Sequence, residues 1–531
     1  MNSGSRHASE NSLKTVGLLP IANPYEKITT GFSFVEEAKV WIHECAHDHT
    51  ALCDLEEASR PRFTNLRVID CHASRDARER LEIVDAPPGC VYFALSYVWG
   101  PVAKPPFPLP QTIKDSITTV LLLGYSYLWV DRYCIDQQDA EDKHEQIQQM
   151  GAIYAGAFVT IIAYAEHDPY KGLPGVSRDC SASKEMPPNN NEVEISTEKS
   201  IWPTRAWTFQ EYHLSRRKLF FTDYGRIWEC RAWNDSSIKC NGKAISDIVV
   251  TKLRSHETTL VWMCTFEQWW DSMSRYSTRK LSYPSDALNA ISGVLSMYAT
   301  RDPPIKHFWG VPYFRNDEGN RHFALIDLGW SVSSAGKRRE GFPTWSPLGW
   351  QDFQELSGNF MNFPCCSPNF DVEAELDGLF RHLDLITSND QAMQRISQGS
   401  QSLRITAYSA ELDIESQPSA SSAGSRHEMN LPITKDQSVW IMPRWDSKSL
   451  ALEPGASVYC VFHSSTFASG LIIKSCGEYF ERMGTFVPAG VDQLDFEQNL
   501  ADALEGRLWG DSECLDADAG SFIARKTFLL R

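Results

Sequence analysis

The chain has 531 residues, of which 42% are hydrophobic and 11% aromatic, and it carries a formal net charge of −17. This length is too great for one ordinary hydrophobic core, so two or three domains are predicted. The acidic balance, without a strong basic block, argues against nucleic acids and anionic membrane surfaces as partners. No stretch approaches the roughly 18–20 apolar residues that a membrane span needs.

Fourteen cysteines are spread thinly along the chain, without the spacing of a disulfide framework. Such usage is typical of a reducing compartment and of mostly buried thiols. The first 18 residues contain no apolar core of a secretion signal. We therefore expect a cytoplasmic protein, and the sequence predicts no resident cofactor and no metal.

Strands and helices alternate over the first 230 residues. The predicted elements are helices at 35–58, 112–123, 141–155 and 204–214, strands at 66–69, 81–84, 92–97, 127–130 and 158–163, and a hairpin at 218–221 and 226–230. This alternation predicts an α/β fold built from βαβ units.

The segment from Leu128 to Gln137 places two carboxylates directly after an apolar strand. Asp131 ends the apolar run and Asp136 follows in a polar loop. In open α/β sheets the polar groups at the carboxyl ends of strands face the ligand crevice. The sequence therefore predicts Asp131 at such a crevice.

The remainder of the chain changes character several times. A polar insertion at 166–200 precedes a helix-rich segment at 245–298, a Ser/Gln/Ala-rich stretch at 389–424 indicates flexible connections, and short apolar runs from Val439 onward indicate a β-rich C-terminal part. The predicted units are a tail and helical segment at 1–60, an α/β domain at 61–300 with its core at 92–211, a connecting region at 301–390, and a smaller β-rich domain at 391–531.

His43, Glu44 and His47 fit the H-E-x-x-H pattern of zinc proteases on a predicted helix. The extended motif would need Gly at 50 and His at 53, where Thr50 and Cys53 stand. We therefore do not predict a catalytic zinc.

Cys45, His49 and Cys53 follow one another at intervals of four residues on the same predicted helix. Eight helical residues rise about 12 Å, so a straight helix cannot bring all three to one ion. Two alternatives stay open. The side chains are buried thiols and a surface histidine, or a helix break together with Cys71 or His72 completes a structural site.

Three blocks in fixed order resemble the fungal heterokaryon incompatibility (HET) domain. They are Ala94-Leu95-Ser96-Tyr97-Val98-Trp99-Gly100, Leu128-Trp129-Val130-Asp131 through Cys134-Ile135-Asp136-Gln137, and Arg205-Ala206-Trp207-Thr208-Phe209-Gln210-Glu211. The resemblance implies a role in fungal non-self recognition and regulated cell death, with self-association and other incompatibility proteins as partners.

The HET core is in turn similar to Toll/interleukin-1 receptor (TIR) domains, which implies a flavodoxin-like core sheet with flanking helices. Some TIR domains cleave NAD with a Glu four residues after a helical Trp, the spacing of Trp207 and Glu211. The resemblance thus implies a NAD glycohydrolase in which Glu211 is the catalytic acid. NAD or a related nucleotide would be the substrate, and the ligand-binding candidates are Ser96, Tyr97, Trp99, Asp131, Asp136 and Trp207.

Structural roles for the same residues stay open. Trp207 would be a core residue, Glu211 an ion-pair partner of Arg205 or Arg216, and Asp131 a cap for backbone amides of its own loop. In that case the core is a non-enzymatic interaction module that signals by assembly.

Overall fold

The computed structural model describes most of the α/β region and the strands of the C-terminal part. The described residues are 34–54, 63, 65–76, 80–100, 109–165, 168–178, 193–195, 200–223, 225–232, 238–240, 243–244, 258–301, 304–316, 323–332, 336–351, 356–357, 366–367, 370–383, 401–412, 429–432, 438–446, 457–462, 470–488 and 523–531. The Pro-rich segment after Gly100 and most of the predicted insertion at 166–200 lie outside them.

A seven-stranded mixed sheet forms the centre of the α/β region, in the order β2-β1-β4-β3-β5-β7-β8. Its strands are β1 (Arg67–Asp70), β2 (Ile83–Asp85), β3 (Tyr92–Ser96), β4 (Tyr127–Trp129), β5 (Val159–Ala163), β7 (Arg217–Thr222) and β8 (Gly225–Cys230). The four central strands β4, β3, β5 and β7 are parallel, and an antiparallel partner joins them at each side. Every residue of β3, β5 and β7 is buried, as expected for parallel strands covered on both faces. The α/β class and the predicted strand positions are confirmed.

The connecting helices place the switch point of the sheet at β3. The helices of this region are α3 (Cys71–Asp76), α4 (Gln111–Leu122), α5 (Asp131–Cys134), α6 (Ala140–Gly156), the 3₁₀ turn η3 (Trp202–Thr204) and α7 (Thr208–Leu214). From β3 the chain passes through α4 to β4 on one side, then returns through α5 and α6 to β5 on the other. Ligand crevices of open α/β sheets lie at such a point, at the carboxyl ends of the strands.

The N-terminal helix is interrupted, where a continuous helix over 35–58 was predicted. It forms α1 (Phe34–Asp48) and the short α2 (Thr50–Cys53), with His49 at φ −111° and ψ 21° between them. The prediction was wrong at this residue because the chain turns there toward the edge of the sheet. Arg216 Nη1 donates a hydrogen bond to the Cys53 carbonyl oxygen at 2.8 Å.

Part of the predicted insertion is also regular. β6 (Val193–Ile195) pairs with β9 (Ile238–Cys240), which in turn pairs with β10 (Lys243–Ala244). The loop assigned to 166–200 is therefore wrong over residues 193–195. Their partner strand lies more than forty residues downstream and cannot be read from the local pattern.

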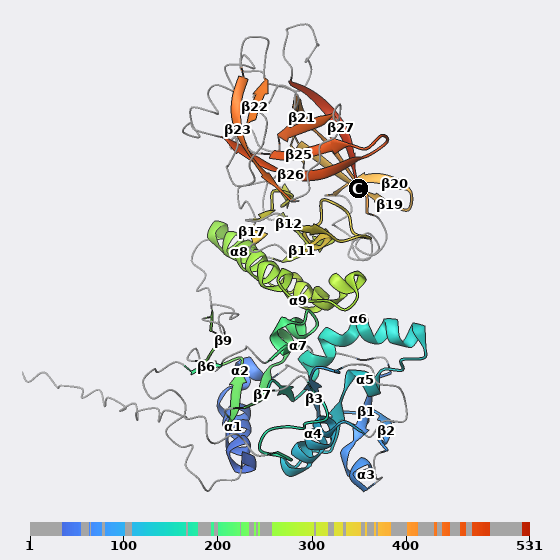
Figure 1. Cartoon of the computed structure of the whole chain (residues 1–531), viewed down its shortest axis with the longest axis vertical. Coiled ribbons are helices and arrows are strands. Elements are labelled where there is room, and N and C mark those ends of the chain that lie inside the picture. Colours follow the sequence, from blue (N-terminus) through green and yellow to red (C-terminus); the bar gives the residue numbers. More distant parts are fainter. Residues whose placement is uncertain are drawn as a thin grey trace, which may run out of the picture.

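Two long helices lie between the α/β region and the β-rich part (Figure 1). They are α8 (Thr258–Ser277) and α9 (Asn289–Ala299), with the 3₁₀ turn η4 (Pro284–Ala287) before α9. At the contact of α9 with α6 and α7, two glycines face each other. A Cβ atom at Gly151 would lie 2.9 Å from the Gly293 Cα and 3.0 Å from Leu214 Cδ1. This close approach holds α7 against both longer helices.

Replacing Gly151 with Val is expected to destabilise the protein by about 1–3 kcal/mol, because the added methyl groups push α9 away from α6. Urea unfolding measures the change. Ala152→Val, on a partly buried neighbouring position of the same helix, serves as the control for β-branching. Equal midpoints for the two variants would contradict the close packing.

The β-rich part contains a ten-stranded sheet, preceded by a layer of shorter strands. The shorter elements are β11 (Ile305–Phe308), β12 (Val311–Asn316), β13 (Phe323–Ile326), β14 (Ser331–Val332), β15 (Lys337–Arg338), η5 (Pro347–Gly349), β16 (Trp350–Gln351) and β17 (Leu356–Ser357). The ten strands are β18 (Cys366–Ser367), β19 (Phe370–Leu376), β20 (Leu379–His382), β21 (Leu403–Leu412), β22 (Met429–Pro432), β23 (Ser438–Trp445), β24 (Val458–Phe462), β25 (Gly470–Ser475), β26 (Phe480–Pro488) and β27 (Ile523–Leu530). β27 pairs with both β21 and β26, so β21, β24, β25, β26 and β27 close into a ring.

The β-rich C-terminal expectation is confirmed, with one local difference. β21 lies inside the stretch at 389–424 that was predicted to contain flexible connections. Its residues Leu403, Ile405 and Ala407 are buried, whereas Arg404, Thr406 and Tyr408 between them are partly exposed. The polar residues among them made this strand similar in composition to a flexible connection.

Arg482 on β26 is fully buried and joins the ring of strands to the preceding layer. Its Nε donates to Asp446 Oδ2 at 2.8 Å, and its Nη1 and Nη2 donate to the carbonyl oxygens of Leu328 and Trp330. The guanidinium carbon lies 3.6 Å from the centroid of the Trp330 ring. The buried guanidinium is thus held by a carboxylate, two backbone carbonyl oxygens and an aromatic ring.

Arg482→Ala is expected to lower the free energy of unfolding by about 3–5 kcal/mol, because it leaves the Asp446 carboxylate buried without its partner. Thermal and urea unfolding of the whole chain measure the loss. Arg525→Ala, on an exposed position of β27, should change stability by less than about 0.5 kcal/mol. A wild-type midpoint for Arg482→Ala would refute this role.

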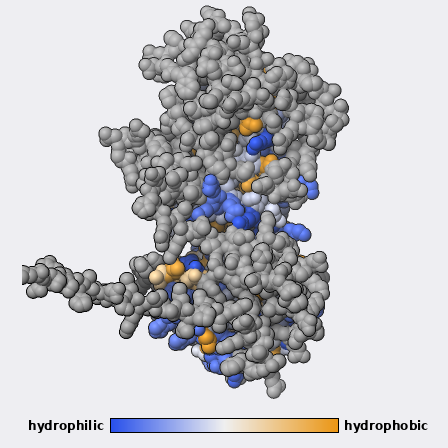
Figure 2. Space-filling model, turned by 90° about the vertical axis from the view of Figure 1, so that its left-hand side faces the viewer, coloured by the Kyte–Doolittle hydropathy of each residue, from blue (hydrophilic) through white to orange (hydrophobic). Residues whose placement is uncertain are grey.

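Within the described part of the chain, every helix is too short or too polar to traverse a bilayer. On the face shown in Figure 2, the described residues are mostly hydrophilic, with small and separate apolar spots. Isolated apolar side chains of this kind are ordinary on protein surfaces and do not mark a docking site.

Candidate functional site

A buried hydrogen bond joins the carboxyl end of β3 to α7. Ser96, the last residue of β3, is fully buried, and its hydroxyl donates to the Glu211 carboxylate. The Ser96 hydroxyl oxygen also accepts a hydrogen bond from Trp202 Nε1 at 2.7 Å. Glu211 is only 4% exposed. The two predicted residues Ser96 and Glu211 therefore meet, at the switch point of the sheet.

A second carboxylate lies at the end of the neighbouring strand β4. Both oxygens of Asp131 lie 3.0 Å from Trp99 Nε1, and Oδ1 also accepts the Arg132 amide at 2.7 Å. The Arg132 guanidinium in turn lies 5.6 Å from the centroid of the Trp99 ring. Tyr97 is 5% exposed, and burial followed by the Asp131 charge raises the pKa of its hydroxyl. Asp131 thus caps its own loop, as one alternative held, and also fixes Trp99.

Burial raises the pKa of both acids. Burial raises the pKa of Glu211 to about 8, and the Asp131 charge adds to the rise, while the Ser96 hydrogen bond and the Arg205 charge oppose it. Burial also raises the pKa of Asp131 to about 6, and the Arg132 amide and the Trp99 indole oppose that rise. At neutral pH Glu211 is therefore mainly protonated and Asp131 mainly ionised. A neutral acid beside an ionised one is the arrangement of many acid–base sites.

Three residues of this cluster were not among the predicted site residues. The Arg205 charge lowers the pKa of both acids, so its guanidinium lies near both. Tyr154 is fully buried and its side chain interacts with that of Glu211. Its hydroxyl donates to the Leu95 carbonyl oxygen at 3.2 Å. Trp202 belongs to no motif, and its only signal is its place three residues before Arg205.

Two predicted ligand residues lie apart from the Ser96–Glu211 contact. The Trp207 indole donates to Asp286 Oδ2 on η4 at 3.3 Å, so its polar edge is directed at the helical layer. Asp136 accepts the Gln138 amide at 2.9 Å. Asp136 also lines a groove, together with Asn65, Arg67, Asp85, Asp139, Glu141, Asp142 and Glu145.

The structure also decides between several alternative roles. Arg216 donates to the backbone carbonyl oxygens of Cys53, Ala155 and Ala157, and hence is not the partner of Glu211. The Cys134 thiol is buried, and burial raises its pKa to about 12, as is typical of an unreactive structural thiol. The exposed rings of His43 and His47 stack at a centroid distance of 5.9 Å on the outer face of α1.

A family model described as heterokaryon incompatibility protein (HET) matches residues 92–211. The match begins on the first residue of β3 and ends on Glu211. The chain carries a HET domain. The HET domain thus includes β3, β4, β5 and the connections that bring Ser96, Asp131 and Glu211 together.

The chain is also 24% identical to heterokaryon incompatibility protein 6, OR allele, of Neurospora crassa, in a match that covers 36% of this chain. The match spans about a third of that relative's length, 35%. No solved structure matches the chain.

The pH dependence of stability tests the environment of Glu211 in the HET domain. Its native pKa of about 8 lies above its ordinary value of 4.5, so between these values the unfolded chain releases a proton that the native chain keeps. The contribution of Glu211 to stability is fully present below pH 4.5 and declines as pH rises toward 8, by at most about 1.4 kcal/mol per pH unit. Glu211→Gln removes this decline. The free energy of unfolding of the variant, measured in urea, should therefore rise relative to that of the wild type between pH 5 and 8.

Glu141→Gln, at an exposed position, provides the matched control and should follow the wild-type pH profile. Parallel profiles for the wild type and Glu211→Gln would show that the Glu211 carboxyl titrates normally in the folded protein.

Proposed function

We propose that this chain acts in fungal heterokaryon incompatibility, in non-self recognition and the regulated cell death that follows, and that it does so in the cytoplasm. The HET domain at 92–211 and the similarity to the Neurospora protein support this role. Self-association and other incompatibility proteins are the partners that we propose.

We further propose that the cluster at the switch point is a nucleotide site. One observation carries this proposal: two acids with raised pKa values, Asp131 and Glu211, lie with Arg205 at the carboxyl ends of parallel strands. Perturbed acids in such a position are characteristic of functional sites.

A flavodoxin-like, TIR-like core is part of the same proposal. The parallel strands stand in the order β4-β3-β5-β7, which is second, first, third and fourth along the chain. Flavodoxin-like sheets begin with this order and bind their ligand beside the first strand.

The proposed reaction is cleavage of NAD at the nicotinamide–ribose bond. As that bond breaks, the ribose gains oxocarbenium character, and water adds at the same carbon to give ADP-ribose, nicotinamide and a proton. An ionised Asp131 would favour the developing positive charge, and the neutral Glu211 would hold a ribose hydroxyl. Arg205 supplies a charge suited to the pyrophosphate.

The burial of Glu211 and Ser96 makes this site closed in the conformation described. Substrate can reach Glu211 only after its contact with Ser96 opens. We therefore propose that the chain is inactive until self-association shifts α7 away from β3. Such control fits a reaction whose uncontrolled progress would be lethal.

The same burial supports a second candidate function, a non-enzymatic module that signals by assembly. Ser96, Glu211 and Trp207 are each satisfied by protein partners, and Trp207 is engaged with Asp286. In this case the polar cluster stabilises the HET domain and takes no substrate.

Consumption of NAD by the purified full chain separates the two functions. The wild type is measured at high concentration and after fusion to an oligomerising tag, beside Glu211→Gln and the exposed control Glu141→Gln. Enzymatic function predicts release of nicotinamide by the wild type and the control, and a loss of about tenfold or more in Glu211→Gln, because the carboxyl that holds the ribose hydroxyl is replaced.

No turnover by the clustered wild type would favour the assembly module. Equal turnover by Glu211→Gln would place the chemistry at another site. Circular dichroism of each variant establishes that loss of activity is not loss of fold.

A further inference from the structure

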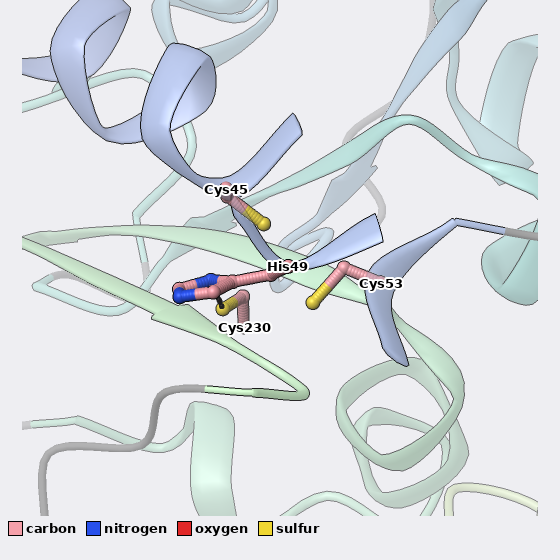
Figure 3. A group of neighbouring side chains, drawn as sticks. All are labelled: Cys45, His49, Cys53 and Cys230. Carbon is pink, nitrogen blue, oxygen red and sulfur yellow. Dashed lines mark hydrogen bonds between the residues drawn. The ribbon is translucent and has the colours of Figure 1, made fainter. Parts of the chain in front are cut away.

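Four metal-ligating side chains gather at the edge of the seven-stranded sheet, away from the residues that the proposed function uses. They are Cys45, His49, Cys53 and Cys230, and their ligand atoms all lie within 4.8 Å of one another. Figure 3 shows the three sulfur atoms and the imidazole turned toward a common space. Cys45, Cys53 and Cys230 are buried and none is in a disulfide.

The break in the N-terminal helix creates this arrangement. Along a straight helix Cys45 and Cys53 would stand about 12 Å apart. Because the chain leaves the helix at His49, α2 folds back and returns Cys53 to the level of Cys45. The fourth member, Cys230, is the last residue of β8 and lies 181 residues after His49 in the chain.

One of the two alternatives drawn from the sequence completed such a site with Cys71 or His72, but neither residue takes part in it. The Cys71 thiol is directed at the carbonyl oxygen of Ile69, and His72 is exposed. The fourth ligand was missed because β8 is far along the chain, and only the antiparallel β7–β8 pairing brings it to α2.

The donor set is that of a structural zinc site. Three thiolates and one imidazole in a closed tetrahedron are a common structural zinc coordination, with ligand atoms about 3.5–3.8 Å apart. Cys230 Sγ and His49 Nδ1 are already 3.4 Å apart. A Zn²⁺ ion would therefore need only small adjustments of the side chains.

The surroundings also suit the charge of such a complex. Zn²⁺ with three thiolates and a neutral imidazole carries one net negative charge. The fully buried Arg217 lies beside it, with Nε 3.2 Å from Cys45 Sγ and Nη2 2.5 Å from Asp54 Oδ1. A buried guanidinium that donates to a ligating sulfur is the outer-shell partner expected of a metal site.

We propose that Cys45, His49, Cys53 and Cys230 bind one structural Zn²⁺ ion, which ties α1 and α2 to the edge strand β8. This departs from the expectation of no metal drawn from the sequence. The break in the helix brings the ligands together, and the ion would bind all four of them. It would thereby attach the N-terminal segment to β8. This zinc proposal does not depend on NAD cleavage, because none of the four ligands is in contact with Ser96 or Glu211 in the described structure.

Metal content of the full-length protein, purified and dialysed against metal-free buffer, tests the proposal. We expect one zinc per chain in the wild type and less than a tenth of that in Cys53→Ser and Cys230→Ser. Cys71→Ser removes a buried thiol outside the group and should keep the full zinc content. Removal of zinc by a chelator should lower the Tm of the wild type by roughly 5 °C or more.

A second measurement covers the case in which the serine variants do not fold. Wild-type protein refolded with Co²⁺ should show the intense absorption of cobalt bound by thiolates in tetrahedral geometry. The proposal is overturned by wild-type protein without stoichiometric zinc and without that absorption. An intact mass two hydrogens lower, with a disulfide mapped between two of these cysteines, or equal zinc loss in Cys71→Ser, would overturn it as well.

Discussion

The buried hydrogen bond between Ser96 and Glu211 fixes the short helix α7 against the carboxyl end of the central sheet, and much of the molecule is arranged around that helix. Its neighbouring residues each bond to a different element. Gln210 accepts the Gly293 amide on α9, and the Tyr212 hydroxyl donates to Glu229 on β8 at 2.8 Å. A seven-residue helix has little stability of its own, so these contacts determine where it lies. Movement of Glu211 away from Ser96 would therefore disturb the contacts of α7 with the helical layer and with the edge of the sheet.

Through α7, the inside of the sheet is connected to the helical layer outside it. Trp207, at the beginning of α7, is bonded to η4, whereas Glu211, one turn later, is bonded to β3. The two residues share a helix face but serve different neighbours. A partner that shifted α9 or η4 would change the surroundings of the Glu211 carboxyl without touching it. Since burial of that carboxyl causes most of its raised pKa, such a shift would also change its protonation.

Two buried arginines, Arg217 and Arg482, lie where distant parts of the chain meet. Arg217 lies between the N-terminal helices and the sheet, where a sulfur and a carboxylate accept its donors. Arg482 lies between the β-rich ring and the layer before it, where Asp446 and backbone carbonyls do the same. A desolvated cation tolerates few arrangements of its partners, so each arginine specifies one relative placement of the segments that it joins.

The sequence by itself determined the local elements and the residues at the end of each strand. Continuous apolar runs separated by amphipathic segments were sufficient to predict β3, β4, β5 and the long helices α4 and α6, because period and burial are local properties. The placement of Ser96 and Asp131 at the carboxyl ends of their strands followed from the same pattern.

Only the tertiary structure decided which of these residues meet. It joined Ser96 to Glu211 and directed Trp207 to Asp286, it broke the first helix at His49, and it brought Cys230 to Cys53 across the β7–β8 hairpin. Contacts of this kind depend on strand order and on packing between segments that lie 79 to 181 residues apart in the chain. Local propensity carries no information about such distances, and the raised pKa values of Asp131 and Glu211 exist only once folding has removed water from around them.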